Sequence, residues 1–156
     1  MDTGDMDTKP KLDDLRNSVW RLFLTAQVKL LDRIKARFSQ AGLPPMEWYD
    51  VLLTLKEAPA YRVRLSELAD QVLLSRSNLT RLVDRLEKAE LLHREPCPSD
   101  RRGTFAVLTE AGLAMQQKMW TVYAEGITDF FGCHLDDEEL KVMERVLKRM
   151  LVAVCE

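Results

Sequence analysis

Residues that build metal sites, disulfide frameworks and acid–base catalysts are scarce in this sequence. Its three cysteines, Cys97, Cys133 and Cys155, are widely separated and include no CxxC pair, which argues against a disulfide framework and a structural zinc site. Histidine occurs only at positions 93 and 134, and there is no HExxH, no GxSxG and no glycine-rich phosphate loop. We therefore expect no metal, no cofactor and no enzymatic activity.

Long hydrophobic runs are also missing. No apolar stretch approaches the roughly 18 residues that a membrane-spanning helix needs. The first residues, MDTGDMDTKPKLDD, are acidic and polar, unlike a signal peptide. We expect residues 1–10 to form a disordered arm, and we expect a cytoplasmic protein with no membrane partner.

The chain has little net charge, and its charges are unevenly distributed. The formal net charge is −2 over 156 residues, so the field of the whole molecule gives no pull toward nucleic acid. Charged residues make up 31% and hydrophobic residues 46% of the chain, as in ordinary globular domains. Residues 61–103 carry nine basic against seven acidic residues, whereas residues 104–156 carry five against nine. The small positive excess therefore lies in the middle of the chain.

The spacing of apolar residues predicts a mainly helical chain with one small hairpin. Steps of three and four residues predict helices over 11–40, 46–57, 67–72, 76–89, 110–131 and 137–154, and alternation predicts strands over 61–65, 91–95 and 104–108. Ser66, Ser75 and Thr109 are suited to cap three of these helices. A helix–turn–helix followed by a two-stranded hairpin describes a winged helix. The predicted fold class is therefore mainly α with a small β-hairpin wing, an α+β winged helix.

The helix predicted over residues 76–89 has the pattern of a DNA-recognition helix. Its apolar residues form one stripe, and Ser77, Asn78, Thr80 and Arg81 lie away from that stripe near its N-terminal end. Recognition helices contact bases mainly with N-terminal residues, and arginine can bind guanine through two hydrogen bonds. The alternative is a surface helix with a solvated polar face. The short helix before it and the basic hairpin after it favour DNA binding.

The stretch CPSDRRGTFAVLT, residues 97–109, predicts a wing with a basic tip. The minor groove of DNA is narrow and strongly negative, so an inserted arginine is stabilised there. We expect Arg102 to enter that groove with Arg101 beside it, and Asp100 to accept a hydrogen bond from the Arg102 guanidinium and fix its direction. The alternative is a surface salt bridge, worth at most about 1 kcal/mol.

At these residues the sequence resembles the MarR family of bacterial transcription regulators. The resemblance is carried by LSELADQVLLSRSNLTRLVDRLEKAELLHREPCPSDRRGTFAVLTEAG, residues 65–112. It implies a triangular, intertwined homodimer whose winged lobes bind double-stranded DNA at a pseudo-palindromic operator, associated with the nucleoid when bound. It also implies a repressor, and because many members of the family release DNA when a small aromatic or phenolic ligand binds, it implies release of the operator by such a ligand. Two positions depart from the family pattern, which often has glycine where Leu73 and Glu90 stand.

The resemblance assigns residues 11–45 to an N-terminal dimerisation helix and linker, 46–109 to the DNA-binding domain and 110–156 to C-terminal dimerisation helices. The residues expected to contact DNA are Ser75, Arg76, Ser77, Asn78, Thr80, Arg81, Arg85, Asp100, Arg101 and Arg102. The wide apolar surface of the last helix, which includes Leu147, Leu151 and Val154, independently favours a dimer. The alternative is that the terminal helices pack on each other within one chain.

A ligand site and a redox site are two competing predictions for regulation. Residues expected to form an effector pocket are Arg16, Trp20, Phe23, Trp48, Tyr49, Trp120 and Tyr123, since aromatic walls with a few polar groups suit a flat aromatic anion. Aromatic residues at helical spacing are more often core. The alternative function is a thiol-based redox-sensing DNA-binding regulator that uses Cys97 or Cys133, where a nearby cation would raise thiol reactivity.

Overall fold

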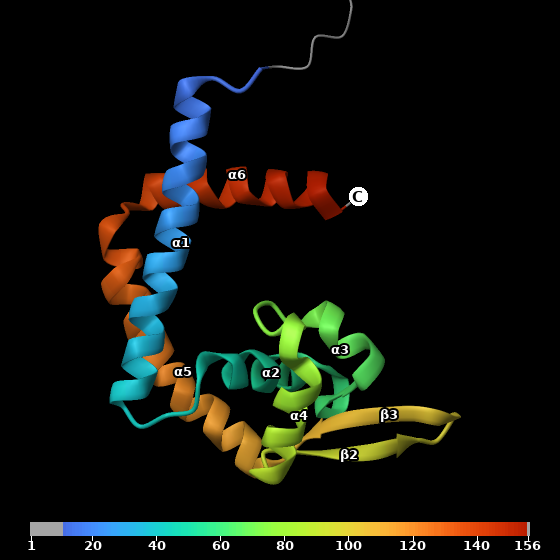
Figure 1. The fold of residues 1–156 in the computed structure, drawn as a ribbon. Helices are drawn as coiled ribbons and strands as arrows, with labels where there is room; N and C mark the ends of the chain where they lie inside the picture. Colours follow the sequence, from blue (N-terminus) through green and yellow to red (C-terminus); the bar gives the residue numbers. More distant parts are fainter. Residues whose placement is uncertain (1–10, 156) are drawn as a thin grey trace, which may run out of the picture.

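The computed structural model describes residues 11–155, and the predicted arm over 1–10 lies outside them. The helices are α1 (Asp14–Gln40), α2 (Met46–Glu57), α3 (Leu65–Gln71), α4 (Leu79–Lys88), α5 (Glu110–Phe130) and α6 (Asp137–Cys155). The strands are β1 (Arg62–Arg64), β2 (Leu92–Cys97) and β3 (Asp100–Leu108), and short 3-10 turns are η1 (Pro59–Tyr61), η2 (Arg76–Asn78) and η3 (Gly132–His134). Figure 1 shows a lobe of α2, α3, α4 and the sheet beside a column of α1 and α5.

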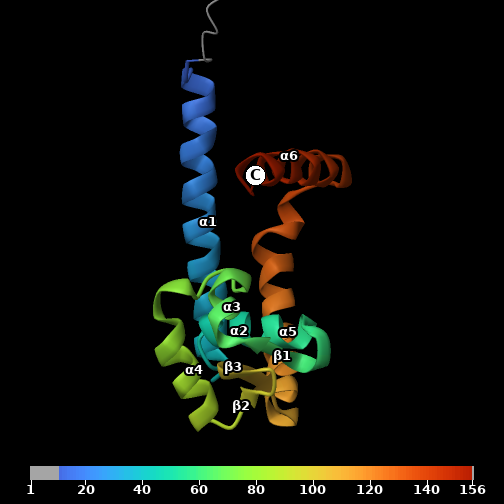
Figure 2. The same ribbon diagram turned by 90° about the vertical axis from the view of Figure 1, so that its right-hand side faces the viewer.

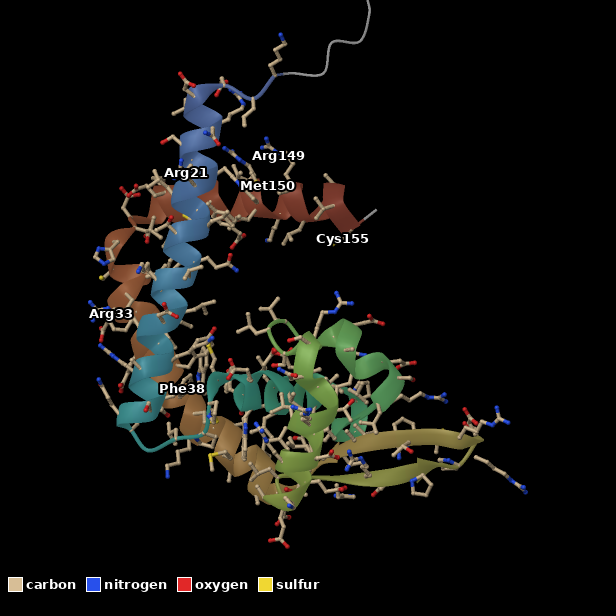
Figure 3. All side chains as sticks on the ribbon, in the orientation of Figure 1. Arg21, Arg33, Phe38, Arg149, Met150 and Cys155 are labelled. Atoms are coloured by element: carbon tan, nitrogen blue, oxygen red, sulfur yellow. The ribbon has the colours of Figure 1, made fainter. Side chains whose placement is uncertain are left out.

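The long helix α1 has a buried foot and an exposed upper half. Asp13 caps its start by accepting a hydrogen bond from the Arg16 backbone N–H at 2.7 Å. Near its end, Ile34 and Phe38 are buried and join the core. Figure 2 shows the upper half of α1 standing apart from α6, and Figure 3 shows Phe38 at the foot of the helix. Within residues 11–155, the foot of α1 is therefore the part of the helix that is packed.

The sheet is antiparallel and has the strand order β1-β3-β2. β3 lies in the middle, with Val63 of β1 opposite Ala106, and Leu92 of β2 opposite Leu108. The register of β2 shifts between Pro96 and Cys97, next to the tip of the hairpin. The two long strands leave the lobe as a projecting wing in Figure 1. The mainly helical winged-helix fold predicted from the sequence is confirmed.

The core of the lobe lies where α2, α4 and the sheet meet. Its fully buried side chains include Leu52 and Leu55 of α2, Leu86 of α4 and Leu92 of β2. The stripe predicted on the recognition helix faces this core, because Leu82, Val83 and Leu86 are buried. Burial of a large apolar side chain contributes about 1.5–3 kcal/mol, so this stripe fixes which face of α4 is left for solvent.

Three local predictions differ from the structure. Ser66 lies inside α3, which begins one residue earlier at Leu65 and has no side-chain cap. The hydroxyl of Ser75 does not cap the following helix, which starts as the 3-10 turn η2 and becomes α-helical only at Leu79. The hairpin strands predicted over 91–95 and 104–108 extend farther toward the tip in the structure, since β2 runs to Cys97 and β3 starts at Asp100. By contrast, the predicted cap of α5 is present, because Thr109 accepts from the Gly112 N–H at 3.0 Å.

The two positions that depart from the family pattern behave differently. Glu90, just after α4, has a φ of 61° and so adopts the left-handed conformation in which glycine is favoured. Leu73 is absent from the positive-φ residues of the described chain, and its side chain is 83% exposed. The turn before α4 therefore needs no glycine, whereas the exit from α4 carries strain at Glu90 of about 1 kcal/mol.

Glu90→Gly is accordingly expected to stabilise the fold by about 1 kcal/mol, because glycine adopts positive φ at no steric cost. Chemical unfolding monitored by circular dichroism would measure this gain. Lys88→Gly, two residues earlier inside the right-handed helix, is the matched control and should destabilise by about 1 kcal/mol. A loss of stability in Glu90→Gly would show that the side chain of Glu90 contributes more than its backbone costs.

The last helix, α6, has almost no packing within the chain. None of its residues is buried, and its contact with the other described elements is slight. Met150, Leu151 and Val154 expose more than half of their surface, as do Leu15 and Leu22 on α1. Isolated monomers rarely expose apolar surfaces of this extent. No helix within residues 11–155 is long and apolar enough to cross a membrane.

Candidate nucleic-acid interface

The turn η2 and the start of α4 present polar side chains to solvent. Ser77, Asn78, Thr80 and Arg81 are all exposed, on η2 and the first turn of α4. They are held outward because the apolar stripe of the same helix is locked into the core. The side chains available to base edges are therefore two short hydroxyls, an amide and a guanidinium, which are groups that proteins use to read the major groove.

Ser75 is not part of this exposed surface. It is only 4% exposed, and its Oγ donates to Asp50 Oδ2 at 2.9 Å and lies 3.2 Å from the carbonyl oxygen of Glu47. The prediction of a DNA contact for Ser75 is therefore at odds with its position. This burial was not predictable from local residues, because its partner Asp50 lies 25 residues away in the chain.

An arginine that was not predicted as a functional residue connects the C-terminal half of α4 to the wing. Arg94 of β2 approaches Asp84 and lies 2.6 Å from Glu87 Oε1, while its backbone N–H donates to Glu87 Oε2 at 2.8 Å. Hydrogen bonds from its guanidinium to Asp84 and Glu87 raise the pKa of Arg94. Asp84 and Glu87 therefore join α4 to the wing through Arg94.

At the wing tip, Asp100 binds the backbone of Arg102 and not its guanidinium, which differs from the prediction. Asp100 Oδ1 accepts a hydrogen bond from the backbone N–H of Arg102 at 3.0 Å. Among the ion pairs of residues 11–155 there is none between Asp100 and the Arg102 guanidinium. Asp100 thus shapes the backbone of the turn, and the side chains of Arg101 and Arg102 stay exposed.

Four arginines of this surface are unpaired within the described chain. Arg81, Arg85, Arg101 and Arg102 make no ion pair there, whereas Arg76 lies 3.4 Å from Asp70. Free guanidinium groups on one lobe are suited to phosphate oxygens, which attract charge without reading sequence. The local surface is therefore positive, although the whole chain carries a net charge of −2.

The aromatic residues predicted for an effector pocket fall in separate places. Tyr49 packs against Trp120 and Tyr123, with ring centroids 6.5 and 5.1 Å apart, and Phe38 lies 6.1 Å from Tyr123. Burial raises the pKa of both tyrosines, and the charge of Asp50 adds to the effect at Tyr123. We call Phe38, Tyr49, Trp120 and Tyr123 the aromatic cluster. The structure brings three of the predicted residues together here.

The other predicted ligand residues lie outside the aromatic cluster. Trp20 and Phe23 pair with each other at 6.3 Å on the exposed half of α1, and Arg16 binds Asp13 at the start of that helix. Trp48 lines a hollow of about 370 Å³ beside α4. Gln116 of α5 was not predicted. It is 2% exposed, and its Oε1 has no hydrogen-bond partner.

Of the candidate redox cysteines, the one in the wing is covered. Cys97 is 5% exposed, and its Sγ lies 3.3 Å from Ser99 Oγ. Hydrogen bonds with Ser99, together with the nearby charge of Arg64, lower the pKa of the Cys97 thiol. Cys133 is exposed and directs its thiol to the Asp129 carbonyl oxygen at 3.1 Å. Of the two thiols, that of Cys133 is therefore the more accessible.

Comparison with known proteins agrees with the winged-helix fold and its exposed polar and basic surface. The MarR family model matches residues 46–104. The chain is 31% identical to the HTH-type transcriptional regulator MhqR of Bacillus subtilis over 121 residues, 76% of this chain and 79% of that protein. It is 33% identical to AbsC, a MarR family transcriptional regulator from Streptomyces coelicolor, with a TM-score of 0.81 over 94% of this chain and 98% of the other.

A second solved structure adds DNA to the comparison. Sco3205, a MarR family transcriptional regulator from Streptomyces coelicolor crystallised in complex with DNA, is 29% identical, with a TM-score of 0.82 over 94% of this chain and 91% of the other. These matches extend from the winged lobe through the long helices on both sides of it. The chain belongs to the MarR family of DNA-binding transcriptional regulators.

Proposed function

We propose that the protein is a homodimeric repressor that binds a pseudo-palindromic operator with its two winged lobes. The observation that carries the dimer is the exposed apolar surface of α6 and upper α1, which nothing in the described chain covers. In Figure 3 these helices extend side chains, Arg21, Arg149 and Met150 among them, into open surroundings. A two-fold partner would bury both surfaces at once.

In the proposed complex, each lobe uses two elements. The start of α4 enters the major groove with Ser77, Asn78, Thr80 and Arg81. The wing tip, with Arg101 and Arg102, enters the adjacent minor groove. Contact between α4 and β2, strengthened by Arg94, supports this division because it holds helix and wing in one rigid unit. Two-fold symmetry then places the half-sites about 34–36 Å apart.

Base reading and phosphate attraction are expected to separate in two arginine variants. Arg81→Ala should cost roughly 1–3 kcal/mol at the operator and relax the preference for one base pair. Arg102→Ala should weaken binding to many sequences and reduce the salt dependence of the affinity. Fluorescence anisotropy with operator and scrambled duplexes at several salt concentrations measures both effects. Wild-type affinity in both variants would reject these roles.

We also propose that a small aromatic or phenolic ligand releases the operator by binding at the aromatic cluster. Stacked rings beside the unpaired amide oxygen of Gln116 offer apolar walls and one polar group. A ligand can shift lobe spacing only through its affinity difference between states, and a 100-fold loss of DNA affinity needs about 2.7 kcal/mol of coupling. Titration of phenolic acids into the protein–operator complex tests the proposal, which is rejected if no compound releases DNA.

A thiol-based redox regulator is the second candidate function, and the lowered pKa of Cys97 is the observation that favours it. Burial of the same thiol opposes it, because oxidants need access as well as a thiolate. Peroxide treatment of a variant with all three cysteines replaced by serine separates the two routes. If DNA binding is lost as readily in that variant as in the unmodified protein, thiol chemistry is excluded.

A further inference from the structure

The short segment that connects α3 to the recognition helix is held by its backbone and not by its side chains. Leu73 exposes 83% of its surface and Leu74 exposes 37%, so neither side chain anchors the segment. Neither Ser75 nor Asn78 forms a side-chain cap at the start of the following turns. The backbone N–H groups of this segment are partly buried and need hydrogen-bond partners, because an unpaired buried N–H is costly.

Those partners come from one carboxylate on α2. Asp50 Oδ1 accepts from the Leu73 N–H at 3.0 Å, and Asp50 Oδ2 accepts from the Leu74 N–H at 2.6 Å. The Ser75 hydroxyl donates to Oδ2 as well, at 2.9 Å. These four residues are named here the turn clamp.

The carboxylate of Asp50 is buried and has no basic partner in the described part of the chain. It is only 8% exposed, and within residues 11–155 it forms no ion pair with lysine or arginine. A buried charge is costly unless hydrogen bonds satisfy it. Three donors from one short segment do so, and such charge-assisted bonds are about twice as strong as neutral ones. The carboxylate and the segment therefore fix each other.

The clamp lies immediately before the side chains that are proposed to read bases. Ser77 and Asn78 follow it within three residues, whereas the apolar anchors of α4, Leu82 and Leu86, lie farther along the helix. The core thus fixes the body of α4, and the clamp adds hydrogen bonds that hold the segment before its first turn against α2. A small displacement there moves every base-contacting group, and hydrogen bonds to bases tolerate little displacement.

We infer that Asp50 is a positioning residue for DNA reading, which sets the start of the recognition helix by holding the Leu73 and Leu74 amides and the Ser75 hydroxyl. This inference rests on the proposed function, since it takes α4 as the reading helix. Asp50 itself touches no DNA. Its negative charge would by electrostatics alone weaken DNA binding, so its presence is explained by geometry.

The first measurement uses the free protein and is independent of DNA. Hydrogen exchange followed by NMR should show protected amides at Leu73 and Leu74, although Leu73 is among the most exposed leucines. Asp50→Asn keeps the shape of the side chain but replaces one accepting oxygen with an NH₂ group, which is itself a donor and cannot accept from the Leu73 or Leu74 N–H. Exchange at both amides should then accelerate about tenfold or more. Rapid exchange at these amides in the unmodified protein would overturn the inference.

The second measurement compares operator and scrambled DNA. In Asp50→Asn, operator affinity should fall about 10- to 100-fold, while affinity for scrambled DNA should not fall. Ser75→Ala, which retains both backbone bonds to Asp50, should lose about 3- to 10-fold at the operator. Thermal unfolding and light scattering establish that each variant is folded and has the same oligomeric state as the unmodified protein. If a variant lost its operator preference because it unfolded, these two measurements would change as well.

Asp70→Asn is the matched charge control. Asp70 is an exposed acid of α3 that pairs with Arg76, so its removal should raise affinity for operator and scrambled DNA alike and leave their ratio unchanged. If Asp50→Asn also strengthens both equally, Asp50 acts only through its charge and the inference is wrong. If the unmodified protein prefers no sequence, the proposed function fails instead, while the exchange measurement still decides whether the clamp exists.

Discussion

Gly112→Ala is expected to destabilise the protein by at least about 3 kcal/mol, although it adds a single methyl group. A Cβ atom at this position would lie 2.0 Å from the backbone oxygen of Leu91 and 2.6 Å from Leu108 Cδ1. The first of these neighbours is backbone and cannot swing aside. A loss of this size is a large part of the 5–15 kcal/mol that stabilises a typical domain.

The strain would act at the junction between the recognition helix and α5. There Thr109 donates through Oγ1 to the Glu90 carbonyl at 2.7 Å, and its backbone N–H donates to the Leu91 carbonyl at 3.2 Å. Added bulk at Gly112 pushes α5 away from this corner. Gly132→Ala is the control, because its Cβ would meet nothing closer than 3.7 Å. Equal unfolding midpoints for the two variants in urea would contradict the packing described here.

Loss of the dimer is expected to have the largest effect on DNA binding. Leu147→Asp combined with Leu151→Asp puts two charges on the apolar stripe of α6, where the proposed partner packs. Burying unpaired charges is strongly unfavourable, so the protein should become monomeric. Operator affinity should then fall about 100-fold or more, because the affinity of two linked binding lobes exceeds that of a single lobe by factors of about 10² to 10⁴.

The matched control for the dimer variant is Arg145→Asp, which places the same charge on the opposite face of α6. It should leave both mass and operator affinity nearly unchanged. Light scattering gives the mass, and anisotropy with an operator duplex gives the affinity. A double variant that stays dimeric, or a monomer that binds the operator as tightly as the unmodified protein, would refute the proposed arrangement.

Local signals made much of the fold predictable from the sequence. The bounds of α2 and α6 and the Thr109 cap of α5 depend on apolar spacing and on residues within one turn, and these agree with the structure to within a residue. Features of this kind need no knowledge of what packs against the helix.

Features that depend on distant partners were not predictable in the same way. Serine is a residue type that often caps helices, yet the hydroxyl of Ser75 donates a hydrogen bond to the buried Asp50, 25 residues earlier. Arg94 reads as a basic wing residue, yet it serves Asp84 and Glu87 of α4. Asp100 holds a backbone amide and not the arginine side chain. In each case tertiary proximity decides among several hydrogen bonds that the residue type allows.

The central claim is that two lobes of a dimer place α4 in successive major grooves and the wings in the neighbouring minor grooves. Sequences selected from a random duplex library, then probed by guanine methylation interference and hydroxyl-radical footprinting, test it directly. The predicted result is two major-groove clusters centred about 10 base pairs apart, with minor-groove protection next to each that disappears in Arg102→Ala. A single cluster, or protection unchanged by that substitution, would contradict the claim.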